Sequence, residues 1–167
     1  KAIGGIGVKA KPQEDFGHNL DEFLKLISEK TKLIFIANPN NPTGNLIEKS
    51  KISAFLSKVP KHILIVLDEA YDEYLRDEHK SIAFNWLAEY KNLLISRSFS
   101  KAHGLAGLRI GYGVGSKEVI NLMNRVRQPF NVNSIAQTAA IASLDDDDFI
   151  IKSRLINDQG RLQLEKV

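Results

Sequence analysis

The chain has 167 residues, of which 43% are hydrophobic and 26% are charged, with 11 glycines and 5 prolines. These values are typical of a folded globular domain or of part of a larger one, and they exclude a fibrous or disordered chain. The absence of cysteine excludes a disulfide framework, a thiolate metal site, an iron–sulfur cluster and a cysteine nucleophile.

The formal net charge is +3, and the 23 basic and 20 acidic residues are interspersed along the chain. A nucleic-acid-binding domain usually clusters its Lys and Arg with aromatic residues between them, so we expect no nucleic-acid partner. No apolar run approaches the roughly 18 residues of a membrane span, and no signal peptide is visible. We therefore expect a cytoplasmic protein without a membrane partner. The chain begins at Lys1, and we expect it to be part of a longer protein.

The first two thirds of the chain alternate between helical and strand patterns. Apolar residues recur at helical spacing over residues 20–27, and the continuous apolar run Leu33–Ala37 follows. A second helical pattern at 47–56 precedes a second apolar run at 62–67, and a third run lies at 92–96. Continuous apolar runs are typical of strands that are buried on both faces. The alternation predicts a parallel sheet with helices on its faces.

The remaining third predicts one more strand and three helices. Residues 108–114 are rich in glycine and predict a strand that a backbone or a ligand can approach closely. Helices are expected at Lys117–Val126, Ser134–Leu144 and 147–167. The four aspartates at 145–148 are expected to form a solvated loop between helices. A calcium site there is the alternative, but the Gly and the terminal Glu of an EF-hand loop are missing.

Polar residues follow each of the first three apolar runs. Residues 38–44 follow the first run, 68–71 the second and 97–101 the third, and Arg109 comes eight residues after Lys101. Open parallel sheets bind ligands outside the carboxyl ends of their strands. The sequence therefore predicts that amide, carboxylate, phenol, hydroxyl, amine and guanidinium groups meet at one edge of the sheet.

Each of these residues also has an ordinary structural interpretation. Lys101 alone is a surface lysine after a turn, and Asp68 alone is a turn or cap former at a strand end. Asn41 before Pro42 is typical of a turn, and Tyr71 is compatible with core packing. Their convergence at one edge of the sheet is what favours a functional site.

Three motifs at the strand ends resemble those of the pyridoxal-5′-phosphate-dependent aminotransferases of fold type I. They are Asn-Pro-Asn-Asn-Pro-Thr-Gly at 38–44, Asp-Glu-Ala-Tyr at 68–71, and Ser-Phe-Ser-Lys at 98–101 with the later Arg109. The resemblance covers nearly the whole chain, and segments 101–109 and 127–133 are similar to the histidinol-phosphate aminotransferases of that superfamily. It implies an α/β fold: a three-layer α/β/α sandwich with a mostly parallel sheet, the incomplete cofactor-binding large domain.

The resemblance implies a pyridoxal 5′-phosphate cofactor and assigns three catalytic residues. Lys101 would hold the cofactor as a Schiff base and move a proton as general base and acid. Asp68 would pair with the ring nitrogen and keep it protonated. Tyr71 would hydrogen-bond to the phenolic oxygen of the ring.

The resemblance also assigns further cofactor-binding residues. Asn41 would share the phenolic oxygen with Tyr71. Ser98 and Arg109 would bind the cofactor phosphate, Arg109 through a bidentate charge-assisted pair, and Ser100 is a weaker candidate for the same phosphate.

For the whole protein, the resemblance implies transamination between L-histidinol phosphate and 2-oxoglutarate in histidine biosynthesis, by a homodimer. Residues 1–144 would be the central part of the large domain, and residues 145–167 a helix that leads toward a C-terminal small domain. Parts of the phosphate site and of the substrate site lie outside this stretch in the family, so we expect the isolated chain to be inactive.

Several alternatives remain open. The chain is also compatible with another fold type I enzyme, such as a threonine-phosphate decarboxylase or an aromatic or aspartate-type aminotransferase, and with a catalytically incompetent binding unit. The glycines at 4–7 and 111–117 do not complete a dinucleotide-binding or P-loop motif. The four histidines show no metal-ligand spacing, and we expect no metal.

Overall fold

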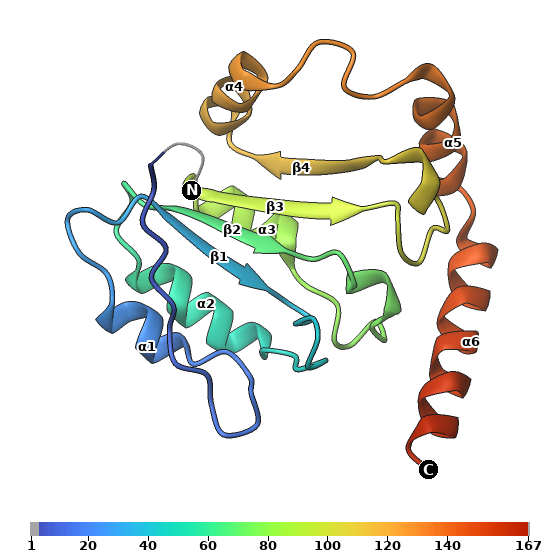
Figure 1. Ribbon diagram of the computed structural model, residues 1–167, viewed down its shortest axis with the longest axis horizontal. Coiled ribbons are helices and arrows are strands. Elements are labelled where there is room, and N and C mark those ends of the chain that lie inside the picture. Colours follow the sequence, from blue (N-terminus) through green and yellow to red (C-terminus); the bar gives the residue numbers. More distant parts are fainter. Residues whose placement is uncertain (1–3, 167) are drawn as a thin grey trace.

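The computed structural model describes residues 4–166 as a sheet with helices packed against it (Figure 1). In chain order, the helices, strands and short 3₁₀ turns (η) are α1 (Leu20–Lys25), β1 (Leu33–Ala37), α2 (Lys49–Lys58), β2 (Leu64–Asp68), η1 (Asp72–Tyr74), α3 (Ala83–Glu89), β3 (Leu93–Ser98), η2 (Ala106–Leu108), β4 (Gly111–Gly115), α4 (Lys117–Val126), α5 (Ser134–Leu144) and α6 (Asp147–Leu164).

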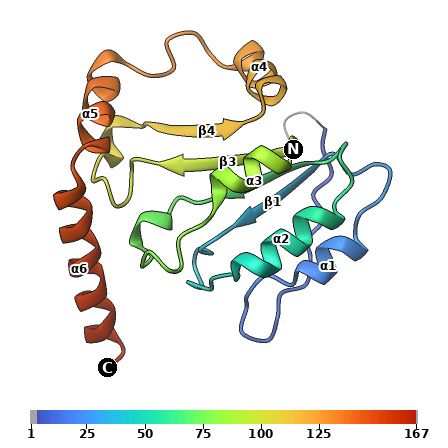
Figure 2. The same cartoon turned by 180° about the vertical axis from the view of Figure 1, so that it is seen from behind.

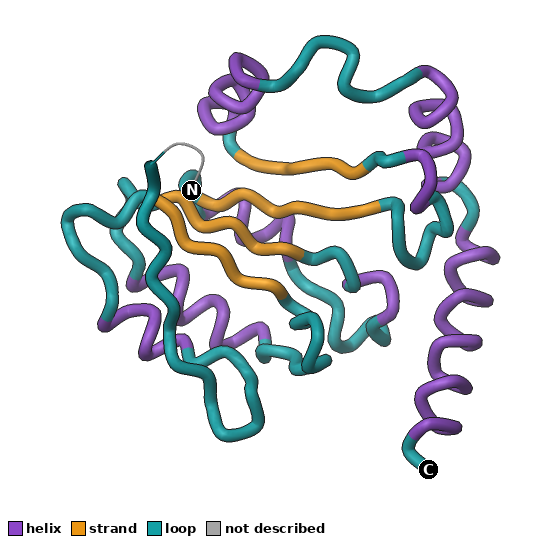
Figure 3. The backbone as a smooth tube through the Cα atoms, in the orientation of Figure 1, coloured by secondary structure: helices purple, strands orange, loops and turns teal. Residues whose placement is uncertain are grey.

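The four strands form one sheet in the order β1-β2-β3-β4 (Figure 3). The pairs β1–β2 and β2–β3 are parallel, and β4 is antiparallel to β3, so the expected mostly parallel sheet is confirmed. The direction of β4 follows from its connection. A parallel neighbour needs a crossover, usually a helix, that carries the chain back along the sheet, whereas residues 99–110 between β3 and β4 hold only a loop and the short η2 at the same end of the sheet.

The fourth strand begins at Gly111 rather than at 108, because η2 and a left-handed residue precede it. Arg109 adopts φ 54° and ψ 49°, which an extended strand does not allow. At Gly111 a Cβ atom would lie 2.7 Å from the carbonyl oxygen of Arg97, so only glycine permits the close approach of β4 to β3.

One face of the sheet carries the main hydrophobic core. The strands contribute alternate residues to it, as the period of two of a β-strand requires, and α2 and α3 cover them (Figure 2). The core side chains are Ile34, Ile36, Ile65, Leu67, Leu93 and Ile95 from the strands, with Ile52, Phe55, Leu56, Ala83 and Trp86 from the helices. The short α3, which the sequence pattern did not predict, is anchored there by Trp86, whose indole Nε1 donates to Ser53 Oγ at 2.8 Å.

The substitution Trp86→Ala is expected to lower the free energy of unfolding by about 3–5 kcal/mol, because it removes a large, 2% exposed side chain and leaves a cavity. Phe84→Ala is the matched control, since Phe84 lies on the same helix but is 75% exposed, and its effect is expected to stay within about 0.5 kcal/mol. Urea unfolding followed by circular dichroism measures both. Equal losses in the two variants would contradict this packing.

Helices lie on the opposite face as well, which agrees with the expected three-layer fold, but they cover it unevenly. Met123 and Val119 of α4 pack near Gly113 and Gly115 of β4, beside Leu94 of β3. Over β1 this face is open within residues 4–166, and Phe35 is 65% exposed there. The second helical layer therefore reaches only the β3–β4 side of the sheet in the described residues.

The helices α4, α5 and α6 confirm the expected helical segments, and each begins at a polar cap. Ser116, Asn133 and Asp146 accept a hydrogen bond from a backbone N–H of the first turn. The aspartates at 145–148 are therefore only partly a loop. Asp146 caps α6 and the next two aspartates lie in its first turn, where carboxylates are favourable near the helix N-terminus. Val167, the last residue of the expected helix, lies outside the described residues.

Residues 4–166 contain neither a helix that could span a membrane nor a cluster of side chains placed to hold a metal ion. None of the helices there has the length and apolarity that crossing a membrane requires. Across the same residues, no group of three or more His, Cys, Asp or Glu side chains is placed to hold a metal ion.

Candidate functional site

The carboxyl ends of β1, β2 and β3 lie side by side at one edge of the sheet (Figure 1). In the register of the strands, Asp68 at the end of β2 lies between Ala37 of β1 and Ser96 of β3. The segments that follow these strands therefore start from neighbouring points, as the sequence pattern predicts for parallel strands.

Tyr71 lies at the centre of the closest grouping of predicted site residues. Asn41 Nδ2 donates to Tyr71 Oη at 2.8 Å, across 30 positions of sequence. Lys101 Nζ lies 5.4 Å from the centroid of the Tyr71 ring, which is within the range of a cation–π contact. The fold thus brings an amide, a phenol and an amine from three different segments to one place, with Asn41 and Lys101 exposed.

Asp68 ends β2 on the face of the sheet opposite the main core, because it alternates with the buried Leu67. Its Oδ1 accepts a hydrogen bond from the backbone N–H of Ala70 at 3.1 Å, so it does form the local turn that its position at a strand end suggests. Although Asp68 directly follows a buried apolar run, it is itself exposed. The physical reason is the uncovered second face of the sheet beside β1 and β2.

The predicted phosphate-binding residues flank the connection between β3 and β4. Ser98 Oγ accepts from the Ser100 backbone N–H at 3.0 Å, which closes the turn that leads to Lys101. Ser98 also pairs with Gly111 of β4. Arg109 lies two residues before Gly111 in the chain and is exposed. The guanidinium of Arg109 donates from Nη1 to the carbonyl oxygen of Ala106 at 2.9 Å.

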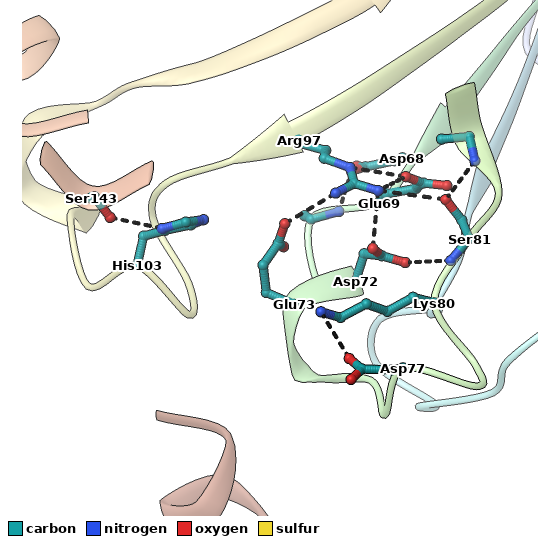
Figure 4. A network of polar contacts seen from close by, with 12 residues as sticks. Asp68, Glu69, Asp72, Glu73, Asp77, Lys80, Ser81, Arg97, His103 and Ser143 are labelled. Atoms are coloured by element: carbon teal, nitrogen blue, oxygen red, sulfur yellow. Dashed lines mark hydrogen bonds and ion pairs between the residues drawn. The ribbon is translucent and has the colours of Figure 1, made fainter. Parts of the chain in front are cut away.

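The turn that carries Lys101 is held from its far side by the C-terminal helices. His103 is buried, and its Nδ1 lies 2.7 Å from Ser143 Oγ of α5 (Figure 4). The ring of Phe99 lies 4.9 Å from the His103 ring, centroid to centroid. Gly104 adopts φ +70°, and a Cβ atom there would lie 3.1 Å from the Phe149 ring of α6. These contacts restrict where the backbone of the Lys101 turn can lie.

Sequence analysis missed a cluster of charged residues on the other side of these strand ends (Figure 4). Arg97 donates to Glu69 Oε2 from Nε at 3.0 Å and from Nη2 at 2.7 Å. The same Nη2 lies 3.0 Å from Asp72 Oδ2, and Nη1 lies 3.3 Å from Glu73 Oε1. The side chains of Arg97 and Glu69 are 19% and 0% exposed. We call these four residues the Arg97 cluster.

Burial and charge oppose one another in the Arg97 cluster. Burial raises the pKa of Glu69, against the lowering effect of the Arg97 guanidinium. Burial acts to lower the pKa of Arg97, but the surrounding carboxylates outweigh it and raise that pKa above its ordinary value. The sequence pattern that could have revealed the cluster is the alternation of side chains between the two faces of a β-strand. Glu69 and Arg97 each come two residues after a core residue, so opposite charges reach the same buried face of neighbouring strands.

A cavity of about 490 Å³ lies apart from these residues, in the connection between α4 and α5. Arg127 lines it and donates to Asn124 Oδ1 at 3.0 Å and to Asn131 Oδ1 at 2.9 Å. None of the seven predicted site residues lines this cavity. The candidate site is therefore the exposed edge of the sheet around Tyr71.

Comparisons with known proteins agree with this arrangement. The family "Aminotransferase class I and II" matches residues 4–166. A curated relative, the histidinol-phosphate aminotransferase of Methylobacillus flagellatus, is 60% identical over 164 residues. That match covers 98% of this chain and 44% of the relative, so the chain spans less than half the length of that relative.

Solved structures are similar over nearly the whole chain. The histidinol-phosphate aminotransferase of Sinorhizobium meliloti, in complex with pyridoxal-5′-phosphate, has a TM-score of 0.84 at 32% identity, over 93% of this chain and 42% of that one. A double mutant of the Thermus thermophilus aspartate aminotransferase has a TM-score of 0.86 at 28% identity, over 98% and 44%. From the family match and these likenesses, we conclude that the chain belongs to the class I and II aminotransferases.

Proposed function

We propose that this chain is the lysine-bearing, cofactor-binding part of an aminotransferase that uses pyridoxal 5′-phosphate. The observation that carries the proposal is the grouping of Lys101 and Asn41 around Tyr71 at the carboxyl edge of the sheet. A family match alone would not require that these residues meet, because they come from separate segments of the chain.

The groups at this edge fit the chemistry of that cofactor. An amine suits its aldehyde, a phenol with an amide donor suits its phenolic oxygen, and a carboxylate at the next strand end suits its ring nitrogen. Hydroxyl and guanidinium groups on the β3–β4 connection suit its phosphate. When bound, the cofactor supplies a protonated ring that accepts the electrons left behind as a Cα–H bond breaks.

Within this proposal, each catalytic residue has a definite task. Lys101 binds the cofactor covalently, and its amine, once released, moves the proton between substrate Cα and cofactor C4′. Asp68 holds a proton at the ring nitrogen. Tyr71 and Asn41 donate hydrogen bonds to the phenolic oxygen and so stabilise its negative charge. Lys101 Nζ lies 5.4 Å from the centroid of the Tyr71 ring, so the amine and the phenol are close to one another.

The cofactor phosphate would bind on the connection from β3 to β4. Ser98 and Ser100 share one turn, and Arg109 stands at the other end of this connection, close to the paired residues Ser98 and Gly111. In this role Arg109 exchanges its present contact with Ala106 for the phosphate, which a guanidinium binds more strongly than a neutral carbonyl.

The substrate pair that we propose is L-histidinol phosphate and 2-oxoglutarate, in histidine biosynthesis. Its support is the 60% identity to the Methylobacillus flagellatus histidinol-phosphate aminotransferase. Backbone similarity does not discriminate, because the TM-scores against the histidinol-phosphate and aspartate aminotransferases are 0.84 and 0.86.

We further propose the setting in which this part acts. Residues 1–144 form the central part of a large domain and 145–167 a helix toward a small domain, with 1–3 and 167 outside the described residues. The complete protein is a cytoplasmic homodimer that acts on small molecules. The exposed apolar side chains of α4 and β1 are consistent with further protein packed against them.

The complete gene product that carries these residues tests the substrate. With 2-oxoglutarate as acceptor, kcat/KM is expected to be highest for L-histidinol phosphate among donors that include L-aspartate and an aromatic amino acid. Carbon dioxide release from threonine phosphate would instead identify a decarboxylase. The purified 167-residue chain is tested separately, with pyridoxal phosphate followed by borohydride. A label on Lys101 without turnover supports a cofactor-binding part, and no label from either protein would refute the proposal.

A further inference from the structure

The Arg97 cluster joins the two segments that carry the proposed catalytic residues. Arg97 is on β3, one residue before Ser98 and four before Lys101. Its carboxylate partners belong to the segment that follows β2, which begins directly after Asp68 and carries Tyr71. We propose that Arg97 is a positioning residue, which holds Tyr71 and Asp68 in place relative to the Lys101 turn. This inference rests on the proposed function.

The partners of Arg97 alternate with the proposed catalytic residues along the chain. Glu69 directly follows Asp68, and Asp72 directly follows Tyr71. Arg97 binds Glu69 and Asp72 with hydrogen bonds of 2.7 and 3.0 Å from the same Nη2 atom. Each proposed catalytic residue on this segment is thus the immediate neighbour of a residue that the guanidinium holds.

Backbone and side-chain contacts make this anchoring stiff. The Glu69 backbone N–H donates to the Ser96 carbonyl oxygen at 2.9 Å, and that of Asp72 donates to the Glu69 carbonyl oxygen at 3.1 Å. Asp72 Oδ1 accepts from the Ser81 backbone N–H at 3.1 Å, so both of its oxygens are used. The planar guanidinium of Arg97 is bonded to several fixed acceptors, so the segment that carries Glu69 and Asp72 has little freedom to shift.

Stability alone does not account for the cluster. Three carboxylates face one guanidinium in a mostly buried place, and burying charge costs free energy that apolar packing does not. Glu69 Oε1 is buried and has no hydrogen-bond partner within the described residues, which adds to that cost. What the cluster does supply is orientation, at the point where the two catalytic segments leave the sheet.

The test uses the complete gene product with bound cofactor and the variants Arg97→Lys, Tyr71→Phe and the double substitution. Lysine keeps the charge but cannot bond several carboxylates in a fork. We expect Arg97→Lys to lower kcat by about 10- to 100-fold, the scale of a displacement near 1 Å. We expect the pH midpoint of the visible cofactor absorption to rise, as in Tyr71→Phe, because a donor to the phenolic oxygen is displaced. In the Tyr71→Phe background, Arg97→Lys should then add little to the rise of the pH midpoint, because that donor is already absent.

Ile52→Val is the control for a general loss of stability, because it trims a core residue of α2 that lies outside the segments carrying the proposed catalytic residues. It should lower the melting temperature and leave kcat and the pH midpoint unchanged. An Arg97→Lys protein that behaves like this control, or shifts of the pH midpoint that add fully in the double variant, would overturn the inference.

Two further outcomes can be told apart from those above: an Arg97→Lys protein that does not fold, and an unaltered protein that does not bind the cofactor. If Arg97→Lys does not fold, Glu73→Ala decides, since it removes only the 3.3 Å contact at the more exposed edge of the cluster. A smaller rise of the midpoint supports the inference, and an unchanged midpoint overturns it. If the unaltered protein takes no borohydride label at Lys101, the proposed function fails and this inference fails with it.

Discussion

The substitution Lys101→Ala is expected to abolish covalent attachment of pyridoxal phosphate and to lower the transamination rate by about 10²- to 10⁴-fold, the range for one general acid–base. Alanine has no amine to bind the aldehyde or to move the proton between Cα and C4′. The remaining residues of the site still favour non-covalent binding of the cofactor. Mass spectrometry after borohydride reduction measures the attachment, and a single-turnover assay of the complete gene product measures the proton transfer.

Two further lysine variants make this test specific. Lys101→Arg keeps the positive charge near the Tyr71 ring but should also fail to attach the cofactor, since a guanidinium remains protonated. Lys51→Ala removes an exposed lysine of α2 and should retain full attachment and activity. A label that persists in Lys101→Ala would show that another lysine carries the cofactor.

The substitution Asp68→Ala is expected to preserve attachment at Lys101 and to slow the breaking of the Cα–H bond by about 10²- to 10³-fold or more. Without the carboxylate, nothing holds the proton at the ring nitrogen, and the negative charge that develops is less well stabilised. With a donor that is deuterated at Cα, the isotope effect on kcat should increase, because proton transfer then limits turnover.

The control variants separate two roles of Asp68, its negative charge and its hydrogen bond within the local turn. Asp68→Asn keeps an oxygen that can accept from the Ala70 N–H, so it should preserve the local turn and still lose most of the rate. Asp21→Asn changes an exposed aspartate in the first turn of α1 and should have no effect on the rate. A near wild-type rate for Asp68→Ala would assign the ring nitrogen to a different residue.

The sequence by itself determined most of the sheet and the order of the candidate site residues. The strands β1, β2 and β3 are continuous apolar runs, and such runs predict strands, although β1 is buried on only one face within residues 4–166. The helices α4, α5 and α6 begin at polar caps, which depend on contacts only a few residues apart. Features that rest on local periodicity or on local hydrogen bonds can be read from one chain without a structure.

The same local reasoning located the residues around Tyr71 without placing them. It predicted that Asn41, Tyr71 and Lys101 follow three neighbouring strands, and the fold brings them into contact. Their roles toward a cofactor stay predictions, as do those of Asp68 and Arg109. The motif carries the residue types and their order, while distances depend on how three separate loops fold back onto the sheet edge.

Only the tertiary structure decided the features that arise between distant segments. The short α3 is held by the burial of Trp86 and its bond to Ser53, 33 positions away, and the direction of β4 follows from a connection that contains no crossover helix. The exposure of Asp68 follows from which face of the sheet the helices leave open. The Arg97 cluster pairs charges that are 24 to 28 positions apart. Such contacts depend on long-range packing, which no short stretch of sequence encodes, because each partner alone is compatible with several surroundings.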